Sequence, residues 1–332
     1  MSLILPRPRR AAAVLAAAAL TVAGLSACSS TSGKKVYVVG YSVPAPAYSA
    51  VGDAFAKTSE GKDVSLVSTF GPSGTEAKAV AGGQKADVVN FSTPGDLTSL
   101  VPSKVDSDWN QGPTKGYITK SVVVIVVQKG NPLGVKGWDD LVKPGVKIVT
   151  PVPSTSGSAK WNILAAYEHV IADGGTPAQA TDYLKNFFGH VVSRPASGSE
   201  ATQQFLNGTG NVLISYESEA ILAKQADKPL DYIVPDETVQ IENPAAVTSA
   251  ASDQGKAFLN YAESEAGQEI FAGSGFRPAL PGVKVGTVQG ANDPNNPFPT
   301  PAHLITVESL GGWDKVNEQF FGDNGISTSL GA

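Results

Sequence analysis

A Ser- and Gly-rich loop joins a predicted strand to a predicted helix near the middle of this chain. The stretch "PVPSTSGSAKWN" (Pro151 to Asn162) holds three Ser, one Thr and one Gly, and it contains no acidic residue. Such a loop presents backbone N–H groups and hydroxyls at the positive end of the helix dipole, an arrangement that suits an oxyanion. Ser and Thr are also ordinary N-cap residues. One loop alone therefore indicates no more than a cap.

Similar loops recur where other predicted strands end. Four of the six such loops are Ser/Gly-rich and open a helical run. The carboxyl ends of strands in an open α/β sheet meet at one crevice, where ligands bind. We therefore expect these loops to converge on an anion site. The six loops are "YSVPAPAYS", "FGPSGTEAK", "FSTPGD", "PVPSTSGSAK", "SRPASGSEA" and "SYESEA".

The elements that must position these loops follow an alternating pattern. Amphipathic runs such as 76–84 and 159–172 predict helices. Short apolar strands alternating with helices are typical of a parallel sheet that is covered on both faces. The expected fold class is therefore α/β and doubly wound. The predicted strands are 35–42, 63–70, 86–92, 121–129, 146–152 and 211–216.

Residues 1–27 are predicted to be a signal peptide. Three Arg precede the apolar run "AAAVLAAAALTVAGL", and "LSAC" follows it and ends at Cys28. The sequence around Cys28 resembles the bacterial lipobox, in which the Cys carries lipid in the mature protein. Polar residues 28–34 would form a flexible tether. We expect a protein anchored by lipid at Cys28 on the extracytoplasmic face of the membrane.

Charge and cysteine usage exclude several classes of protein. Removal of residues 1–27 leaves 305 of the 332 residues, with 22 of the 25 Lys and Arg and all 30 Asp and Glu, so the net charge is −8. This acidic balance argues against a nucleic-acid partner and against a polybasic membrane patch. Cys28 is the only cysteine, so no intrachain disulfide is possible.

The chain lacks the residue spacing that catalytic and metal sites need. "GPSGT" satisfies neither the G-x-S-x-G nucleophile elbow nor the P-loop pattern. His169, His190 and His303 have no zinc-site spacing. We therefore expect no enzyme activity, no metal and no cofactor. The rival hypothesis is a surface hydrolase that uses Ser156, with Lys160 four residues later.

Residues 118–169 resemble the central segment of bacterial sulfate-binding proteins, the extracytoplasmic subunits of sulfate/thiosulfate ABC importers. The elements that carry the resemblance are "KGNP", "WDDLVKPGV" and "SGSAKWN". The resemblance continues in "GPSGTEAKAVAGGQKADVV", "GNVLISYESEA", "EAGQEIFAGSGFRP" and "GGWDKV". The resembling segments occur in the same order as in the family and cover most of the mature chain. Motifs that match by chance would not keep a common order over such a length.

The resemblance implies a two-lobed type II periplasmic-binding-protein fold. Each lobe would be a mostly parallel sheet flanked by helices, with the ligand cleft between the lobes. Residues 35–117 and 242–332 are predicted to form lobe I, and residues 118–241 to form lobe II. Two chain crossings would join the lobes, so that the hinge closes on the ligand. The implied partners are sulfate and the permease subunits of an ABC importer, and we expect a monomer.

The resemblance also implies a set of neutral hydrogen-bond donors from two loops. Ser73 in "GPSG" would donate its hydroxyl and its backbone N–H. Ser156 would donate its hydroxyl, next to the backbone N–H groups of Gly157 and Ser158. The family usually has Gly where this chain has Ser158, so a side chain is added where backbone approaches ligand closely.

Other implied residues differ more from the family pattern. The "RPASGS" loop would supply one backbone N–H. A one-residue difference in loop length from the family leaves both Ala196 and Ser197 as candidates for this donor. Tyr216 stands where a family Trp donates its indole N–H, and Ser42 where an Asp organises the first loop. Lys160 matches an Arg that supports its loop from behind.

A site built only from donors favours a fully ionised anion. Hydrogen phosphate carries a proton, and a buried donor facing that proton is left unsatisfied at a cost of about 1 to 3 kcal/mol. Sulfate has no such proton. We expect Glu76, Glu200 and Glu217, the carboxylates near the loops, to cap helices or pair with Lys. Thiosulfate, molybdate and phosphate are the alternative ligands.

The lipid anchor yields the first testable prediction. Cys28→Ala should move the protein from the membrane fraction to the soluble extracytoplasmic fraction, because it removes the predicted lipid attachment site. Cell fractionation followed by immunoblotting measures this, and Ser29→Ala in the same tether is the control. Undiminished membrane association of Cys28→Ala would contradict the lipobox interpretation.

Overall fold

The computed structural model describes residues 34–331 of the 332-residue chain. The predictions for the signal peptide, for Cys28 and for tether residues 28–33 lie outside the described residues. Lys34, which was predicted to end the tether, is the first residue of strand β1. Within the described range, no helix combines the length and the apolar character needed to cross a bilayer.

The strands pair in the order β2-β1-β3-β9-β4-β7-β5-β6, with β8 and β10 also pairing with β4 and β11 with β9. β1 lies parallel to β2 and β3, and β5 lies parallel to β6 and β7. The strands are β1 (Lys34–Tyr41), β2 (Val64–Gly71), β3 (Val88–Asn90), β4 (Tyr117–Gln128), β5 (Ile148–Val149), β6 (Val191–Ser193), β7 (Val212–Tyr216), β8 (Leu230–Ile233), β9 (Glu237–Val247), β10 (Arg277–Pro278) and β11 (His303–Ile305).

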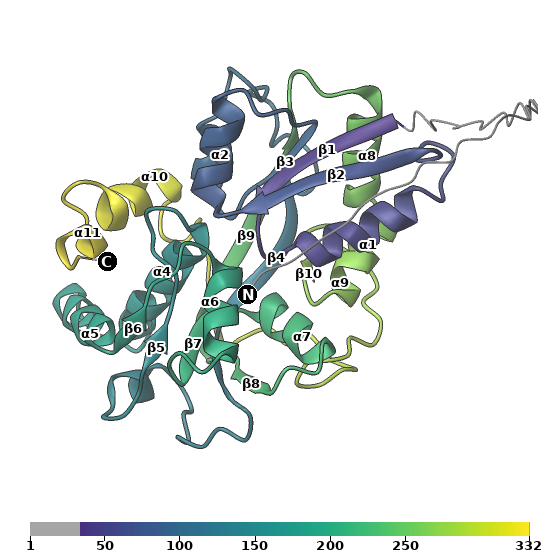
Figure 1. Ribbon diagram of the computed structural model, residues 1–332. Helices are drawn as coiled ribbons and strands as arrows, with labels where there is room; N and C mark the ends of the chain where they lie inside the picture. The colour runs from purple at the N-terminus through teal and green to yellow at the C-terminus, as the bar shows by residue number, and fades with distance from the viewer. Residues whose placement is uncertain (1–33, 332) are drawn as a thin grey trace, which may run out of the picture. The chain divides into compact units, whose positions relative to one another are not determined.

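Two long strands, β4 and β9, connect the two ends of this arrangement (Figure 1). β9 pairs with β3 through residues 245–247 and with β4 through residues 240–244. β4 pairs with β7 through residues 123–127. These pairings are antiparallel, within sheets that were expected to be mostly parallel. The predicted lobe boundaries, at 117/118 and 241/242, fall inside β4 and β9, and the division into lobes stays a prediction.

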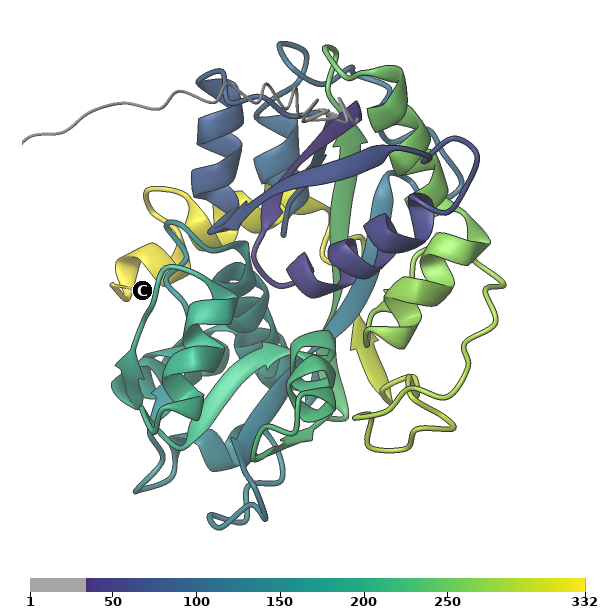
Figure 2. The same cartoon turned by 45° about the vertical axis from the view of Figure 1, so that its right-hand side comes forward.

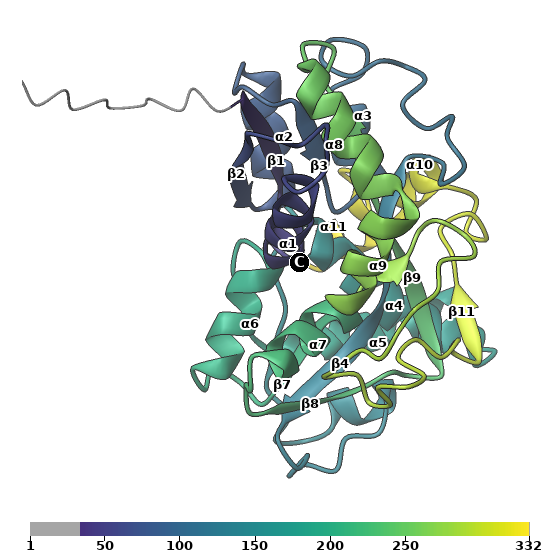
Figure 3. The same cartoon turned by 90° about the vertical axis from the view of Figure 1, so that its right-hand side faces the viewer.

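Helices α1, α2 and α8 lie near β1–β3, whereas α4–α7 lie near β4–β8 (Figures 1 and 3). The helices are α1 (Ala45–Phe55), α2 (Ser73–Ala81), α3 (Pro94–Thr98), α4 (Gly157–Ala172), α5 (Pro177–Gly189), α6 (Gly198–Leu206), α7 (Glu217–Gln225), α8 (Asp253–Glu263), α9 (Glu265–Gly273), α10 (Trp313–Val316) and α11 (Ile326–Ser329), with a 3₁₀ helix η1 (Trp138–Val142) and a π-helical turn η2 (Asn317–Phe321).

The sequence of β4 explains why it occupies the interior. Its residues from Val122 to Val127 are all buried. Val123, Ile125 and Val127 belong to one hydrophobic cluster, and the residues between them belong to another on the opposite face. Side chains alternate across a strand, so an unbroken apolar run requires cover on both faces. The run "SVVVIVV" therefore specifies a central strand.

The C-terminal segment packs against α4 (Figure 2). Trp313 lies edge-on to Trp161 with ring centroids 4.8 Å apart, and Phe320 lies edge-on to Tyr167 at 4.9 Å. The segment that carries Trp313 and Phe320 is therefore packed onto the helix that follows the Ser/Gly-rich loop. Its contacts with α4 fix the helix whose first turn carries the "SGSA" sequence.

A buried ion pair ties α7 to β10 and gives the second prediction. Glu217 is fully buried, and its carboxylate accepts hydrogen bonds from Nε and Nη2 of Arg277 at 2.7 and 3.1 Å. Arg277→Ala should lower the free energy of unfolding by about 3 to 5 kcal/mol, because the carboxylate stays buried without its partner. Urea titration at neutral pH measures the change.

The control for this prediction is an exposed ion pair. Lys115 and Glu308 lie 3.8 Å apart, with side chains 72% and 86% exposed. Lys115→Ala should leave the free energy of unfolding nearly unchanged, since exposed pairs contribute little. Similar small effects of both substitutions would show that the buried pair is not a stability determinant.

Candidate functional site

The N-termini of α2, α4 and α6 meet at one place. The backbone N–H of Gly74 in α2 donates to the carbonyl oxygen of Thr155, just before α4, at 3.1 Å. The hydroxyl of Thr155 donates to the carbonyl oxygen of Ala196, just before α6, at 2.8 Å. Three of the Ser/Gly-rich loops are therefore in direct contact, as the sequence predicted.

The loop after β1 reaches the same place. A Cβ atom added to Gly198, at the start of α6, would lie 3.0 Å from Oγ of Ser158 and 3.3 Å from Cγ2 of Val43. Ser42, the preceding residue, is half-buried. Ser42 and Ser158 therefore belong to the group of converging loops.

Ser156 and Ser197 occupy equivalent positions at the two helix starts but use their hydroxyls differently. Ser197 is the N-cap of α6, and its Oγ accepts from the backbone N–H of Glu200 at 3.2 Å. Ser156 is the N-cap residue of α4, is 2% exposed and makes no side-chain capping bond. The ordinary explanation of Ser as a cap holds for Ser197, whereas the hydroxyl of Ser156 is left for another role.

Ser73 directs its hydroxyl at a carboxylate. Its Oγ donates to Oδ2 of Asp96 at 2.6 Å and accepts the backbone N–H of Ser92 at 2.9 Å. A hydroxyl has only one proton. In this arrangement the Ser73 hydroxyl therefore holds α2 against the loop between β3 and α3, and its proton does not point at an anion.

Tyr216 lies fully buried at the start of α7. Its hydroxyl is 2.7 Å from Oγ of Ser92, and either oxygen can be the donor. Burial raises the pKa of the Tyr216 phenol well above its ordinary value, although the polar side chains of Ser158, Ser92 and Asn243 lower it somewhat. The phenol is therefore protonated at neutral pH and can donate a hydrogen bond.

Ser92 was not among the predicted site residues, yet it contacts three of them, Ser73, Gly157 and Tyr216. Its carbonyl oxygen accepts from Nε1 of Trp161 at 2.9 Å and from Nδ2 of Asn243 at 3.0 Å. A Cβ atom on Gly157 would lie only 2.6 Å from both Cβ and Oγ of Ser92. The backbone of α4 thus reaches Ser92 at a distance that only glycine permits.

Lys160 lies one turn into α4, on the side facing the C-terminal segment. Its Nζ is 5.3 Å from the ring centroid of Phe321. A cavity of about 200 Å³ opens beside it and is lined by Gly74, Asp96, Thr155, Ser156, Gly157 and Lys160 among others. This volume is several times that of a water molecule, about 30 Å³. A small ligand has room beside the N-termini of α2 and α4, whereas Ser158, Ser197 and Tyr216 are not among the residues that line this cavity.

Two of the three carboxylates that the sequence placed near the loops have partners. Oε2 of Glu200 accepts the backbone N–H of Ala196 at 3.1 Å. Glu217 pairs with Arg277, where a Lys was expected. Glu76 packs against Gly71 in the first turn of α2, and burial raises its pKa.

Glu219 is a carboxylate that the sequence did not single out. It accepts the hydroxyl of Ser215 at 2.7 Å, and its Oε2 lies 3.5 Å from the Cβ position of Gly198. Burial raises the pKa of this carboxyl, whereas hydrogen bonds from Ser215 and neighbouring hydroxyls lower it. Burial thus disfavours the ionised form of Glu219 next to α6.

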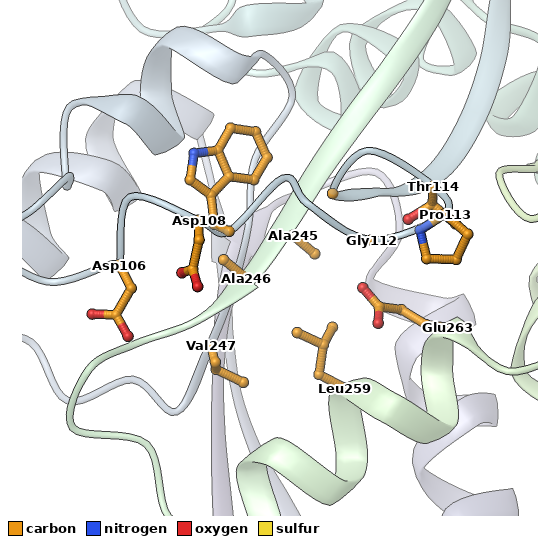
Figure 4. Close-up of a pocket in the computed structure, with 12 residues that line it drawn as sticks. Asp106, Asp108, Gly112, Pro113, Thr114, Ala245, Ala246, Val247, Leu259 and Glu263 are labelled. Carbon is orange, nitrogen blue, oxygen red and sulfur yellow. The ribbon is translucent and has the colours of Figure 1, made fainter.

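A second cavity, of about 220 Å³, lies between β9, α8 and the segment 106–116 (Figure 4). Asp106, Asp108 and Glu263 line it, and none of its lining residues is Lys or Arg. Three carboxylates would repel an anion. This cavity therefore does not suit the ligand class that the Ser/Gly-rich loops suit.

The residues 34–331 contain no group of three His, Cys, Asp or Glu side chains that could hold a metal ion.

Sequence reasoning missed Ser92 and Asn243 for different reasons. Ser92 lies in "FSTPGD", a loop that was recognised without any residue being chosen from it. Asn243 lies in β9, a strand that the sequence did not predict.

Comparison with known proteins gives consistent matches over most of the chain. Residues 36–277 match a family model described as bacterial extracellular solute-binding protein. A sulfate-binding protein of Synechococcus elongatus is 38% identical over 93% of this chain and 93% of its own length. A thiosulfate-binding protein of Pseudomonas aeruginosa is 29% identical over 87% of this chain and 89% of its own.

A solved structure agrees with these matches. The sulfate-binding protein SubI from Mycobacterium tuberculosis H37Rv is 42% identical, with a TM-score of 0.81, and the match covers 87% of this chain and 99% of that chain. The two-lobed α/β fold expected from the sequence is confirmed by this likeness.

The close approach of Gly157 to Ser92 yields the third prediction. Gly157→Ala should lower the free energy of unfolding by about 1 to 3 kcal/mol, because the added methyl group overpacks a filled contact. Denaturant unfolding measures this. Gly189→Ala is the control, since a Cβ there meets nothing within 4 Å. A tolerated Gly157→Ala would mean that α4 and Ser92 are free to separate.

Proposed function

Since this chain belongs to the bacterial extracellular solute-binding proteins, we propose that it captures sulfate and delivers it to the permease subunits of an ABC importer. The family resemblance inferred from the sequence motifs is confirmed by the matches to sulfate-binding proteins. Proteins of this family are extracytoplasmic. Anchoring through lipid at Cys28 and a monomeric state are part of the proposal.

The observation that carries the proposal is the convergence of the N-termini of α2, α4 and α6 near Ser156, whose hydroxyl does not cap a helix. Each helix start has backbone N–H groups that lack intrahelical partners, and these favour an anion. The hydroxyl of Ser156 is buried and does not cap its helix. These donors are neutral, so a chain of net charge −8 can bind a dianion through local dipoles.

Each predicted ligand residue has a role in this proposal. Ser156 donates its hydroxyl, and Gly157 and Ser158 donate backbone N–H groups from the first turn of α4. The N–H of Ala196 is already bonded to Glu200, so Ser197 is the favoured backbone donor of its loop.

The remaining donors come from other loops. Tyr216 donates its phenolic proton, and Ser42 orders the loop after β1. Ser73 contributes its backbone N–H, since its hydroxyl proton is bonded to Asp96. Lys160 supports the α4 loop from the side of the C-terminal segment.

The number of donors is sufficient for tight binding. A hydrogen bond to a charged group contributes roughly 1.5 to 3 kcal/mol. Micromolar affinity corresponds to about 8 kcal/mol. Five or six donors, roughly counted, reach this value after the costs of desolvation and ordering. No salt bridge to the anion is required.

The neighbouring carboxylates support a preference for sulfate over hydrogen phosphate. Asp96 accepts the hydroxyls of Ser73 and Thr93, and Glu219 accepts that of Ser215. The lone pairs that these bonds occupy are not available to the phosphate proton. Thiosulfate, which is also fully ionised at neutral pH, is the principal alternative ligand.

The proposal is tested by isothermal titration calorimetry of the mature chain with sulfate, thiosulfate, molybdate and phosphate. Sulfate should bind most tightly, and Ser156→Ala should weaken it by about 1.5 to 3 kcal/mol, roughly ten- to a hundredfold. Ser103→Ala is the control, because Ser103 is exposed and its hydroxyl bonds to the carbonyl oxygen of Leu100, away from the cavity. It should bind like the parent.

Two outcomes would count against this proposal. Unchanged affinity in Ser156→Ala would place its hydroxyl outside the site. Absence of binding by every anion, together with ester hydrolysis that Ser156→Ala abolishes, would favour the surface hydrolase instead.

A further inference from the structure

Two lysines from different helices line the cavity of about 200 Å³ at the N-termini of α2 and α4. Lys78 lies in α2, within the predicted lobe I, and Lys160 lies in α4, within the predicted lobe II. Residues 153–157, which lead into α4, line the same cavity. The cavity therefore lies where the two predicted lobes meet, and an anion inside it would adjoin Ser156.

The charged groups that line this cavity favour an anion. Lys78 and Lys160 share the lining with a single carboxylate, that of Asp96. Oδ2 of Asp96 already accepts the hydroxyls of Ser73 and Thr93, at 2.6 and 3.1 Å. Two larger cavities have the opposite balance and would repel an anion. Three carboxylates and no Lys or Arg line the cavity of Figure 4, and five carboxylates and two Lys line a cavity of about 380 Å³ next to η1.

Neither lysine of the cavity is neutralised by a partner. Among residues 34–331, no ion pair includes Lys78 or Lys160. Lys78 is exposed in the last turn of α2, where a cation ordinarily stabilises the helix dipole. The Nζ of Lys160 lies 5.3 Å from the ring centroid of Phe321. Both positive charges therefore act on the cavity, in a chain whose net charge is −5.

Charges at the mouth of a site act on the arrival of a ligand. A cleft lined by charge of one sign raises the association rate constant of an oppositely charged ligand, and salt reduces this effect. The dissociation rate constant depends instead on the short contacts of the bound complex. Because the attraction scales with the charge of the ligand, a dianion gains more than a monoanion.

We propose that Lys78 and Lys160 flank the entrance through which the anion reaches Ser156, and that their charges accelerate its capture without contacting the bound anion. This inference rests on the proposed function and adds Lys78, which is not one of the predicted ligand residues, to the path of the anion. It gives Lys160 a second role beside its support of the α4 loop.

The test is stopped-flow measurement of sulfate association with the mature chain, followed by tryptophan fluorescence. At about 0.1 M sodium chloride, Lys78→Gln should lower the association rate constant about threefold and Lys78→Glu about tenfold, with unchanged dissociation rate constants. At about 1 M, where the Debye length is about 3 Å, both variants should match the parent. Lys78→Arg keeps the charge and should retain the parental rate constants.

Lys85 provides the matched control. It is exposed, belongs to the same predicted lobe, and has its Nζ 4.1 Å from the ring centroid of Tyr37. It precedes β3, whereas the converging loops follow the strands. At about 3.3 Å per residue it lies roughly 20 Å from Ser92, beyond the Debye length of about 10 Å at 0.1 M salt. Lys85→Glu changes the net charge as Lys78→Glu does, but it should leave the association rate constant unchanged.

Three results would overturn the inference. The first is a parental association rate constant in Lys78→Glu at about 0.1 M salt. The second is an equal loss in Lys85→Glu, which would assign the effect to net charge. The third is faster dissociation with unchanged association, which would place Lys78 in contact with the bound anion. A parent protein that binds no sulfate would instead refute the proposed function.

Discussion

The close contact between the first turn of α4 and Ser92 is the constraint on which the geometry of the site depends. Gly157 brings the backbone of α4 so near to Ser92 that a single methyl group would collide with it. This contact places the start of α4 beside the starts of α2 and α7. The hydrogen bond from Trp161 to the carbonyl of Ser92 then fixes the rotation of α4 about its axis.

The electrostatic potential where these helix starts meet is set by nearby dipoles and not by the net charge of the chain. The chain is acidic as a whole, with a net charge of −5, yet the converging loops present N–H groups and hydroxyls. The nearby carboxylates are bonded to hydroxyl or backbone donors, as Asp96 is to Ser73 and Glu200 is to the N–H of Ala196. Because neutral dipoles are effective over short distances only, the packing of the helix starts matters more than the net charge.

The sequence predicted six strands, and each of them is present within a few residues of its expected bounds. β9 was missed because Pro244 interrupts its apolar run, and proline usually marks the end of a strand. The pairing of β4 with β9 shifts register between Tyr117 and Thr119, which lets the proline fit opposite Tyr117. With β9 absent from the prediction, the antiparallel pairing of β4 and the contribution of Asn243 could not be foreseen.

The sequence alone determined the α/β class, the family and the loops that would meet, because these depend on periodicity, motifs and the order of elements. The tertiary structure decided which hydroxyls are free. Ser156 and Ser197 occupy the same kind of position in their loops, but only Ser197 caps its helix. The proton of Ser73 is directed by Asp96, 23 residues away. A hydroxyl turns toward whichever acceptor lies nearest in space, and that neighbour is set by folding.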